Sequence, residues 1–395
     1  MNRSKKISAG YSYHNDIRLV KGGPEYFDVL ERMIREATRL IYLQIYILDA
    51  DETGERIINA LLGAAKRSVR IYILVDGYAS QHLPAAIRQK FTDAGIYFRM
   101  FQPLFKSKGF YFGRRLHHKV VVVDTLRYLV GGLNISDRYN DIGDKPAWLD
   151  WALYGEGDVA PVLERICVKR HRTFLNRRER KAREKTAEPP QPVTEIQERN
   201  CAVRVRVNDW VRAKRQIYNS YLEMFRTASS HLIIMSPYFL PGMEFRRKMK
   251  AARKRNVKIQ VVLGGISDIP FSKDAERYLY RWLLRQGIEI YEYQKTVLHG
   301  KMAVCDGEWM TIGSYNVNDL SAHASVELNL DVDNKHFAHT VESRLQTIIT
   351  EDCLQITEED YKKKMNIFRR IHQRMAYNFF RMALFLFTFY FRQQE

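Results

Sequence analysis

The chain has 395 residues, of which 46% are hydrophobic, and it carries a formal net charge of +19. This length and apolar content suit two ordinary domains, and the charge predicts an anionic partner: a nucleic acid, an anionic membrane surface or a phosphorylated substrate. The sequence shows no metal-ligand cysteine spacing, no disulfide framework, no secretory signal and no apolar run of about eighteen residues. We therefore expect neither a disulfide-rich secreted domain nor an ordinary membrane-spanning protein.

Short β-branched and aromatic runs alternate with helical patterns along the chain. The runs expected to form buried strands are Leu40–Tyr46, Val69–Gly77, Gly95–Phe98 and Val120–Val123, then Leu232–Tyr238, Val257–Gly265, Gly287–Ile290 and Met302–Cys305. The segments with helical patterns are Tyr26–Thr38, Glu55–Lys66, Trp210–Thr227 and Ala275–Gln286. This alternation predicts an α/β fold in which helices cover both faces of a sheet. Because the second set of strands repeats the first, two such units are expected in tandem.

The repeat suggests limits for these domains. We expect an N-terminal domain over residues 1–175, a charged linker over 176–200, a C-terminal domain over 201–360 and a basic amphipathic tail over 361–395. The first half also has an insertion, a basic and aromatic loop from Pro103 to Arg115. We interpret this loop as contacting the substrate, because functional residues concentrate on loops held by rigid scaffolds.

A polar motif occurs once in each half, with the two copies in constant register. Its members are His117, Lys119, Asp124 and Asn134 in the first copy, and His299, Lys301, Asp306 and Asn316 in the second, each 182 residues further on. Histidine, lysine and asparagine together suit phosphoryl transfer, because they provide a nucleophile or acid, a cation and a neutral hydrogen-bond donor. Two copies provide two histidines, one to attack phosphorus and one to protonate the leaving alcohol.

These residues resemble the phospholipase D superfamily, whose motif is His-x-Lys-x4-Asp-x6-Gly-Ser-x-Asn. The second copy matches at every position, whereas the first has Gly132 where the family has serine. The resemblance implies two pseudo-symmetric domains, each a mixed sheet flanked by helices, with the active site at their interface. It also implies a double displacement through a phosphohistidine, in which either histidine can be the nucleophile.

The motif residues are expected to have distinct roles. Lys119, Lys301, Asn134 and Asn316 would surround the nonbridging phosphate oxygens, and Ser314 would add a hydroxyl that Gly132 cannot. The two lysines supply positive charge, so no metal or other cofactor is expected. Each motif is expected to lie on a strand, on which alternate residues share a face, so His118 points away from His117 and no catalytic role is expected for it.

Each histidine also needs a partner for its second ring nitrogen. The motif aspartates Asp124 and Asp306 are candidate site residues, although they could instead serve the local framework. Two later acids are better placed to pair with the histidines: Asp150 and Glu327, as the family resemblance also implies. For Asp150 the alternative is an ordinary surface acid.

Within the superfamily, three segments are similar to bacterial cardiolipin synthases of the short type without N-terminal membrane helices: Ile45–Asp49, Trp148–Gly155 and Ser236–Pro241. The resemblance implies transfer of a phosphatidyl group onto phosphatidylglycerol, with phosphatidylglycerol or phosphatidylethanolamine as donor. The alternatives are a phospholipase D hydrolase or a nuclease of the same superfamily, and a non-catalytic nucleic-acid-binding module. Nucleic acid is the less favoured partner, since binding charge needs no pair of histidines. No oligomeric state is predicted.

The C-terminal segment offers independent evidence for a lipid partner. From Met365 to Phe391, apolar residues recur at helical spacing with arginines between them. Its most apolar part, Met382–Phe391, is too short to span a bilayer, so we expect a helix that lies on an anionic phospholipid membrane. The protein would then be peripheral on the cytoplasmic side of the cell membrane. The alternative is a terminal helix packed on the C-terminal domain.

Overall fold

The computed structural model describes residues 10–103, 114–172, 201–209, 212, 214–318 and 325–392. The predicted linker at 176–200 and most of the predicted substrate loop lie outside these residues. The described residues fall into two compact units. Those of unit 1 lie within the ranges Met1–Tyr111, Arg115–Ala147 and Trp151–Val205. Unit 2 runs over Phe112–Arg114, Trp148–Asp150 and Arg206–Glu395.

Unit 1 contains a mixed sheet. Its strands are β1 (Asn15–Lys21), β2 (Leu40–Ile45), β3 (Arg70–Asp76), β4 (Tyr97–Phe101), β6 (Lys119–Val123), β7 (Arg127–Gly131) and β8 (Trp151–Gly157). They lie in the order β1-β8-β7-β6-β2-β3-β4, with β2, β3 and β4 parallel to one another and the remaining pairs antiparallel. The central strands β2 and β6 are buried along their whole length, as expected for a sheet covered on both faces. A two-residue strand, β5 (Arg115–Leu116), precedes β6.

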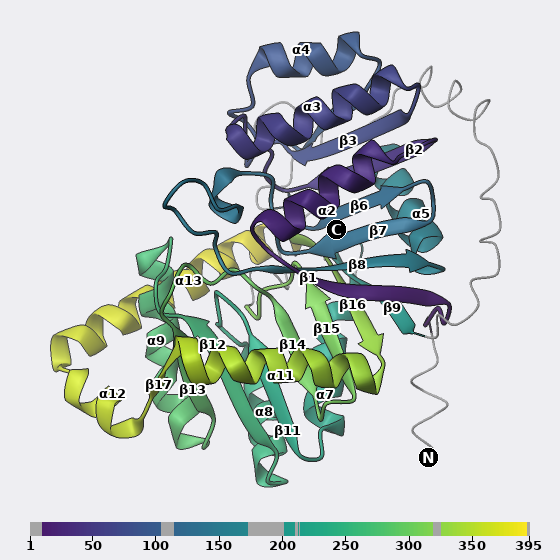
Figure 1. Ribbon diagram of the computed structural model, residues 1–395. Helices are drawn as coiled ribbons and strands as arrows, with labels where there is room; N and C mark the ends of the chain where they lie inside the picture. Colours follow the sequence, from purple (N-terminus) through teal and green to yellow (C-terminus); the bar gives the residue numbers. More distant parts are fainter. Residues whose placement is uncertain are drawn as a thin grey trace. The chain divides into compact units, whose positions relative to one another are not determined.

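Helices cover both faces of this sheet. The helices of unit 1 are α2 (Pro24–Arg35), α3 (Glu52–Lys66), α4 (Ala85–Asp93), the 3₁₀ helix η1 (Asp137–Tyr139) and α5 (Val159–Arg172). Figure 1 shows α2 and α3 on the near face of the sheet and α5 on the far face. Helix α2 buries one side, because its apolar residues recur at helical spacing, from Tyr26 and Phe27 to Met33 and Ile34.

Unit 2 contains a second mixed sheet. Its strands are β9 (Ala202–Asp209), β10 (Lys214–Arg215), β11 (His231–Met235), β12 (Lys258–Gly264), β13 (Glu289–Tyr293), β14 (Met302–Cys305), β15 (Trp309–Gly313), β16 (Ser325–Asp333) and β17 (Cys353–Ile356). Their order is β10-β9-β16-β15-β14-β11-β12-β13-β17. Strands β11, β12 and β13 are parallel, and β14, β15 and β16 continue the sheet with antiparallel pairs.

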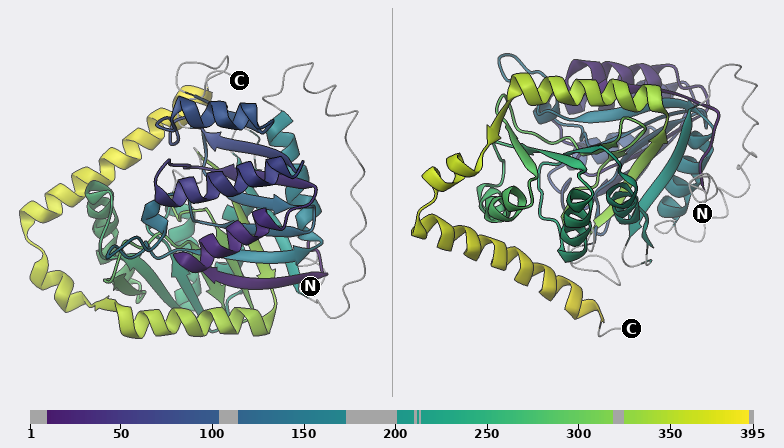
Figure 2. Two further views of the ribbon diagram at one scale, coloured as in Figure 1. Left: turned by 45° about the horizontal axis from the view of Figure 1, so that its top comes forward. Right: turned by 90° about the horizontal axis from the view of Figure 1, so that it is seen from below.

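Helices also cover both faces of the second sheet. The helices of unit 2 are α7 (Gln216–Thr227), α8 (Met243–Lys254), α9 (Pro270–Arg285), α11 (Lys335–Asp352), α12 (Glu358–Lys364) and α13 (Ile367–Arg392). Figure 2 shows α11 on one face and α7, α8 and α9 on the other. The core beneath α7 and α8 joins helix residues such as Phe225 and Phe245 to strand residues such as Ile234 and Val261.

The two sheets repeat one topology, in which three parallel strands adjoin an antiparallel group. This confirms the predicted α/β class and the pair of mixed sheets flanked by helices. Two local expectations are corrected. The motif histidines precede β6 and β14 rather than lying on them. The helix expected from Trp210 begins at Gln216, because Lys214 and Arg215 pair with β9 instead.

The predicted domain limits at 175 and 200 fall among the undescribed residues 173–200, and the limit after 360 falls within α12. Three residues that follow the first motif, Trp148–Asp150, belong to unit 2 rather than to unit 1. Within the described ranges, the longest helices are too short or too polar for one to cross a bilayer.

Candidate active site

The second motif is assembled at one end of the β14–β15 hairpin. His299 and Lys301 lie just before β14, and Ser314 and Asn316 lie just after β15. Because the two strands are antiparallel, with Met302 opposite Ile312, these flanking residues come to the same edge of the sheet. All four side chains are buried, so the sheet end holds a histidine, a lysine, a hydroxyl and an amide away from bulk water.

His299 is oriented by an acid that follows the first motif. The Nδ1 atom of His299 lies 2.5 Å from Oδ2 of Asp150, which is fully buried. Backbone hydrogen bonds fix this approach, because the amide of His299 donates to the carbonyl of Leu149 at 2.7 Å and that of Leu149 donates to Val297 at 2.9 Å. The sequence identified Asp150 as a candidate partner of a histidine, and the structure places it beside the histidine of the second copy.

Lys301 completes this group. Its Nζ lies 2.8 Å from Nδ1 of His299 and also donates to the carbonyl oxygen of His299. One ring nitrogen cannot both accept from Lys301 and donate to Asp150. We assign the Nδ1 proton to the shorter contact with Asp150, because a carboxylate can only accept. Nε2 is then the nitrogen of His299 that can act on a phosphate.

The ammonium group of Lys301 is buried, where a charged group is electrostatically unfavourable. Burial lowers the pKa of the Lys301 ammonium to about 8, against the opposing influence of the nearby acids Asp150, Glu327 and Asp268. The lysine therefore carries a positive charge that only a limited set of carboxylates compensates. Such a cation is suited to stabilise negative charge that develops on phosphate oxygens.

Glu327 contacts the motif serine. Ser314 Oγ donates to Glu327 Oε2 at 2.5 Å and accepts from the amide of Leu328 at 3.1 Å. The amides of Ser314 and Gly132 donate to Leu328 and Trp151, respectively, so Glu327 and Asp150 occupy equivalent positions in the two repeats. Gly132 has no hydroxyl, so the first copy has no counterpart of the Ser314–Glu327 contact.

The first motif has a related arrangement within unit 1. The Nζ of Lys119 donates to the carbonyl of His117 at 2.6 Å, as Lys301 does to His299. Tyr46 packs edge-on against the His117 ring at 4.9 Å, and its ring lies 5.2 Å from the Lys119 ammonium. Asn134 accepts from the amide of Ile47 at 3.1 Å and donates to Tyr139 at 2.8 Å. Lys119 and Asn134 are buried, and His117 is partly exposed.

His118 has a different environment from His117. It is fully buried, and its Nε2 lies 2.9 Å from the side-chain oxygen of Gln44 on β2, whose amide in turn donates to the carbonyl of Cys167 on α5. Burial, together with the charges of Arg170 and Lys119, lowers the pKa of His118 well below its ordinary value. A neutral imidazole in this position ties β2 to its neighbours.

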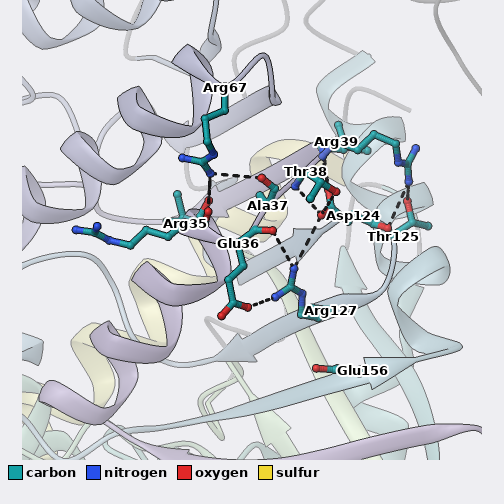
Figure 3. Close-up of polar contacts among 12 residues, drawn as sticks. Arg35, Glu36, Ala37, Thr38, Arg39, Arg67, Asp124, Thr125, Arg127 and Glu156 are labelled. Carbon is teal, nitrogen blue, oxygen red and sulfur yellow. Dashed lines mark hydrogen bonds and ion pairs between the residues drawn. The ribbon is translucent and has the colours of Figure 1, made fainter.

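The motif aspartates bind backbone amides. Asp124 accepts from the amides of Thr38, Arg39 and Leu40 at 2.8–2.9 Å, at the start of β2 (Figure 3). Asp306 accepts in the same way from three successive amides at the start of β11, from Ser229 to His231. Burial alone would raise the pKa of Asp306, but these hydrogen bonds lower it to about 2. A direct catalytic role for either aspartate stays a prediction. The hydrogen bonds of both carboxylates hold the start of a neighbouring strand, which is a structural role.

The motif glycines are needed for close strand approach. A β-carbon on Gly313 would lie 2.3 Å from the carbonyl oxygen of Leu328, and one on Gly131 would lie 2.4 Å from that of Trp151. No side chain fits at these distances, so glycine lets β15 and β7 approach their neighbours just where the site residues begin.

Motif spacing did not single out three further residues, of which two lie near the histidines and one acts on Lys301. Tyr46 contacts His117, and the Trp148 ring lies 6.0 Å from that of His299. Asp268 influences Lys301 and accepts from the hydroxyl of Tyr238 at 2.5 Å. Tyr46, Trp148 and Tyr238 lie in the three segments that resemble cardiolipin synthases, whereas no sequence signal pointed to Asp268. Across the described ranges, His, Cys, Asp and Glu form no group of three that could hold a metal ion.

Comparison with known proteins assigns this arrangement to a family. A family model described as "Cardiolipin synthase, PLD-like domain" matches residues 30–143 and 221–349, which include both motifs. The chain belongs to this phospholipase D-like cardiolipin synthase family. The prediction of an enzyme of this superfamily is thereby confirmed.

Individual members of the cardiolipin synthase family are similar to this chain over most of its length. Cardiolipin synthase B of Salmonella typhimurium is 33% identical over 91% of this chain and 86% of its own length. The protein of the same name from Escherichia coli K12 is 32% identical over 89% and 84%. Among solved structures, the phosphatidylserine synthase of Haemophilus influenzae matches 96% of this chain and 97% of its own with a TM-score of 0.74. Its sequence identity is 15%, so it supports the fold alone.

Proposed function

We propose that the protein makes cardiolipin by transferring a phosphatidyl group onto the headgroup hydroxyl of phosphatidylglycerol. The observation that carries this proposal is the contact between His299 and the buried Asp150, beside the buried Lys301, in a member of the cardiolipin synthase family. An imidazole held by a carboxylate next to a cation suits attack on, or proton transfer to, a phosphodiester. A peripheral location on the membrane is part of the proposal, because the substrates reside in a bilayer.

The reaction is a double displacement in which His117 and His299 take complementary roles. In the first step, Nε2 of one histidine forms a bond to phosphorus, the bond from phosphorus to the departing headgroup oxygen breaks, and the other histidine gives its proton to that oxygen. In the second step, that histidine takes the proton from the hydroxyl of a phosphatidylglycerol, whose oxygen attacks phosphorus and releases the first histidine. With phosphatidylglycerol as donor and acceptor, the products are cardiolipin and glycerol.

The chain's remaining site residues fit this reaction. Lys119, Lys301, Asn134 and Asn316 are proposed to neutralise and bind the nonbridging oxygens, and Ser314 is proposed to hold Glu327. Asp150 is proposed to fix the tautomer of His299 and to stabilise its imidazolium. Phosphatidylethanolamine is a second possible donor, which would release ethanolamine instead of glycerol.

The test is product analysis by mass spectrometry after incubation of the purified protein with phosphatidylglycerol in detergent micelles. We expect cardiolipin and free glycerol as main products, whereas predominant phosphatidic acid would indicate a hydrolase, and inert lipid with rapid DNA cleavage a nuclease. Asp150→Asn should lower kcat by roughly 10²–10⁴-fold with a folded protein, because the imidazole loses its charged partner. A variant with unchanged kcat would contradict the role given to Asp150.

A further inference from the structure

Helix α13 is attached to unit 2 along one side. The rings of Tyr377 and Tyr278 stack at 4.9 Å, and the rings of Phe380 and Phe271 lie 5.8 Å apart, so α13 packs on α9. Gln373 and Ala376 on the same side of α13 are buried. The predicted alternative of a packed terminal helix is therefore correct for this face, and it leaves the opposite face to be explained.

The opposite face of α13 carries large apolar side chains in contact with solvent. Phe368 is 79% exposed and Met375 is 65% exposed. The packing of α13 on α9 alone does not explain why such large apolar side chains face solvent. The members of this exposed stripe, which recur at intervals of three and four residues, are Phe368, Ile371, Met375, Phe379 and Met382. Such spacing places them in one line along the helix. The stripe lies within Met365–Phe391, the segment that the sequence predicts to form an amphipathic helix on a membrane.

The apolar surface extends beyond the helix. The ring of Phe271, at the start of α9, lies 5.4 Å from that of Phe379 in the exposed stripe. Phe271 is itself 38% exposed, and Ile266 and Ile269 in the segment leading into α9 are nearly half exposed. The stripe and this segment thus present apolar groups from two separate parts of the sequence, which is typical of an interaction site rather than of scattered surface residues.

The charges beside the stripe indicate the chemistry of the partner. Arg370, Arg374 and Arg381 are exposed and, at spacings of four and seven residues, form a row along the helix next to the stripe. Helix α13 contains no aspartate or glutamate. A second copy of the chain docked by the same face would bring two arginine rows together, which is unfavourable. A lipid bilayer with anionic headgroups has an apolar interior and a negatively charged surface. It can therefore take up the stripe and bind the arginine row.

We propose that the exposed stripe, with Ile269 and Phe271, docks into the interface of an anionic phospholipid membrane, and that the arginine row binds the lipid phosphates. The helix would lie parallel to the membrane plane, with its tyrosine-bearing side held by α9. This inference concerns binding only and does not depend on which reaction the protein catalyses.

The test is co-sedimentation with vesicles of phosphatidylcholine containing phosphatidylglycerol, carried out in the His299→Ala background so that turnover cannot change the lipid. The double variant Phe368→Ser, Met375→Ser should lower the partition coefficient at least about tenfold, since two large side chains no longer enter the interface. The matched control is Tyr13→Ser, Leu354→Ser, which changes two side chains of 51% and 47% exposure outside α13 and should bind as the parent does.

A second variant separates charge from apolar insertion. The triple variant Arg370→Gln, Arg374→Gln, Arg381→Gln should lose the preference for phosphatidylglycerol over pure phosphatidylcholine vesicles, because only the anionic lipid attracts the arginine row. Unchanged sedimentation of the stripe variant, with circular dichroism matching the parent, would overturn the proposal. A parent that is a dimer in sedimentation velocity, and a stripe variant that becomes a monomer without losing vesicle binding, would assign the face to a second copy instead.

Discussion

At the scale of single residues, the second half-site combines two groups that are costly to bury. Lys301 is 1% exposed and Asp150 is 0% exposed, and the imidazole of His299 contacts both. Removing Asp150 would leave only Glu327 and Asp268 to compensate the charge of Lys301, and removing Lys301 would take the nearby cation from the buried Asp150. Both changes are costly, because poorly compensated buried charges are strongly disfavoured. The lowered pKa of Lys301 places its loss of charge near the pH at which many enzymes are assayed.

We therefore expect activity to fall as pH rises through about 8, because Lys301 then becomes neutral and no longer stabilises the phosphate. Rising pH should affect stability in the opposite direction to activity. The folded protein binds the Lys301 proton more weakly than an unfolded chain does. Between pH about 8 and the ordinary lysine pKa of 10.5, stability should therefore rise with pH as far as Lys301 is concerned. The measurement is kcat against pH alongside the melting temperature.

The control for this assignment is Lys301→Arg. Because an arginine stays charged throughout this pH range, any activity that the variant retains should lack the decline near pH 8. A decline at the same pH in the variant would show that a different group titrates there.

At the scale of elements, the aspartate of each motif links the motif's β-hairpin to the neighbouring strand of the sheet, which is β2 in unit 1 and β11 in unit 2. Asp306 has a φ of 53° and is followed by Gly307 at 62°, a pair of left-handed residues that suits the tight turn from β14 to β15. Its carboxylate binds the three amides that open β11, and Asp124 does the same for β2. These hydrogen bonds fix β11, which pairs with β14, the strand that follows Lys301, so the aspartate positions the site through the sheet rather than by a contact with His299.

We expect Asp306→Asn and Asp124→Asn each to lower the free energy of unfolding by roughly 1–3 kcal/mol, because a charged acceptor of several amide hydrogen bonds becomes neutral. For the wild type, the low pKa of Asp306 means that this stabilisation is present above pH about 4 and is lost as pH falls towards about 2. Denaturant unfolding measures the first effect.

The matched comparison is His117→Ala, which should abolish turnover while changing stability much less, because His117 is partly exposed. If the two asparagine variants kept full stability yet lost activity, the aspartates would be catalytic site residues, as predicted from the sequence, rather than parts of the local framework.

At the scale of the whole molecule, the charge of +19 belongs to a chain whose C-terminal helix combines arginines with exposed apolar residues. In the proposed membrane association, long-range attraction to anionic lipid would come from the entire chain, whereas adhesion would come from the apolar stripe of α13. The two contributions respond differently to salt, because ions screen charges but do not weaken apolar burial.

We expect the affinity for phosphatidylglycerol vesicles to fall at least about tenfold between about 0.1 M and about 0.5 M sodium chloride, as screening shortens the reach of the charges. Residual binding at high salt should depend on the apolar stripe and disappear in Phe368→Ser, Met375→Ser. Vesicle binding that is insensitive to salt would contradict a role for the basic charge in membrane association.

The sequence by itself determined the repeat, the α/β class, the family and the residue types of the site, because apolar periodicity and a polar motif in constant register are properties of the chain alone. Tertiary structure decided which groups meet. Asp150 follows the first motif yet contacts the histidine of the second, and no spacing along the chain encodes that partner. The outer face of α13 was also decided there, because packing on α9 selects which side of an amphipathic helix remains exposed.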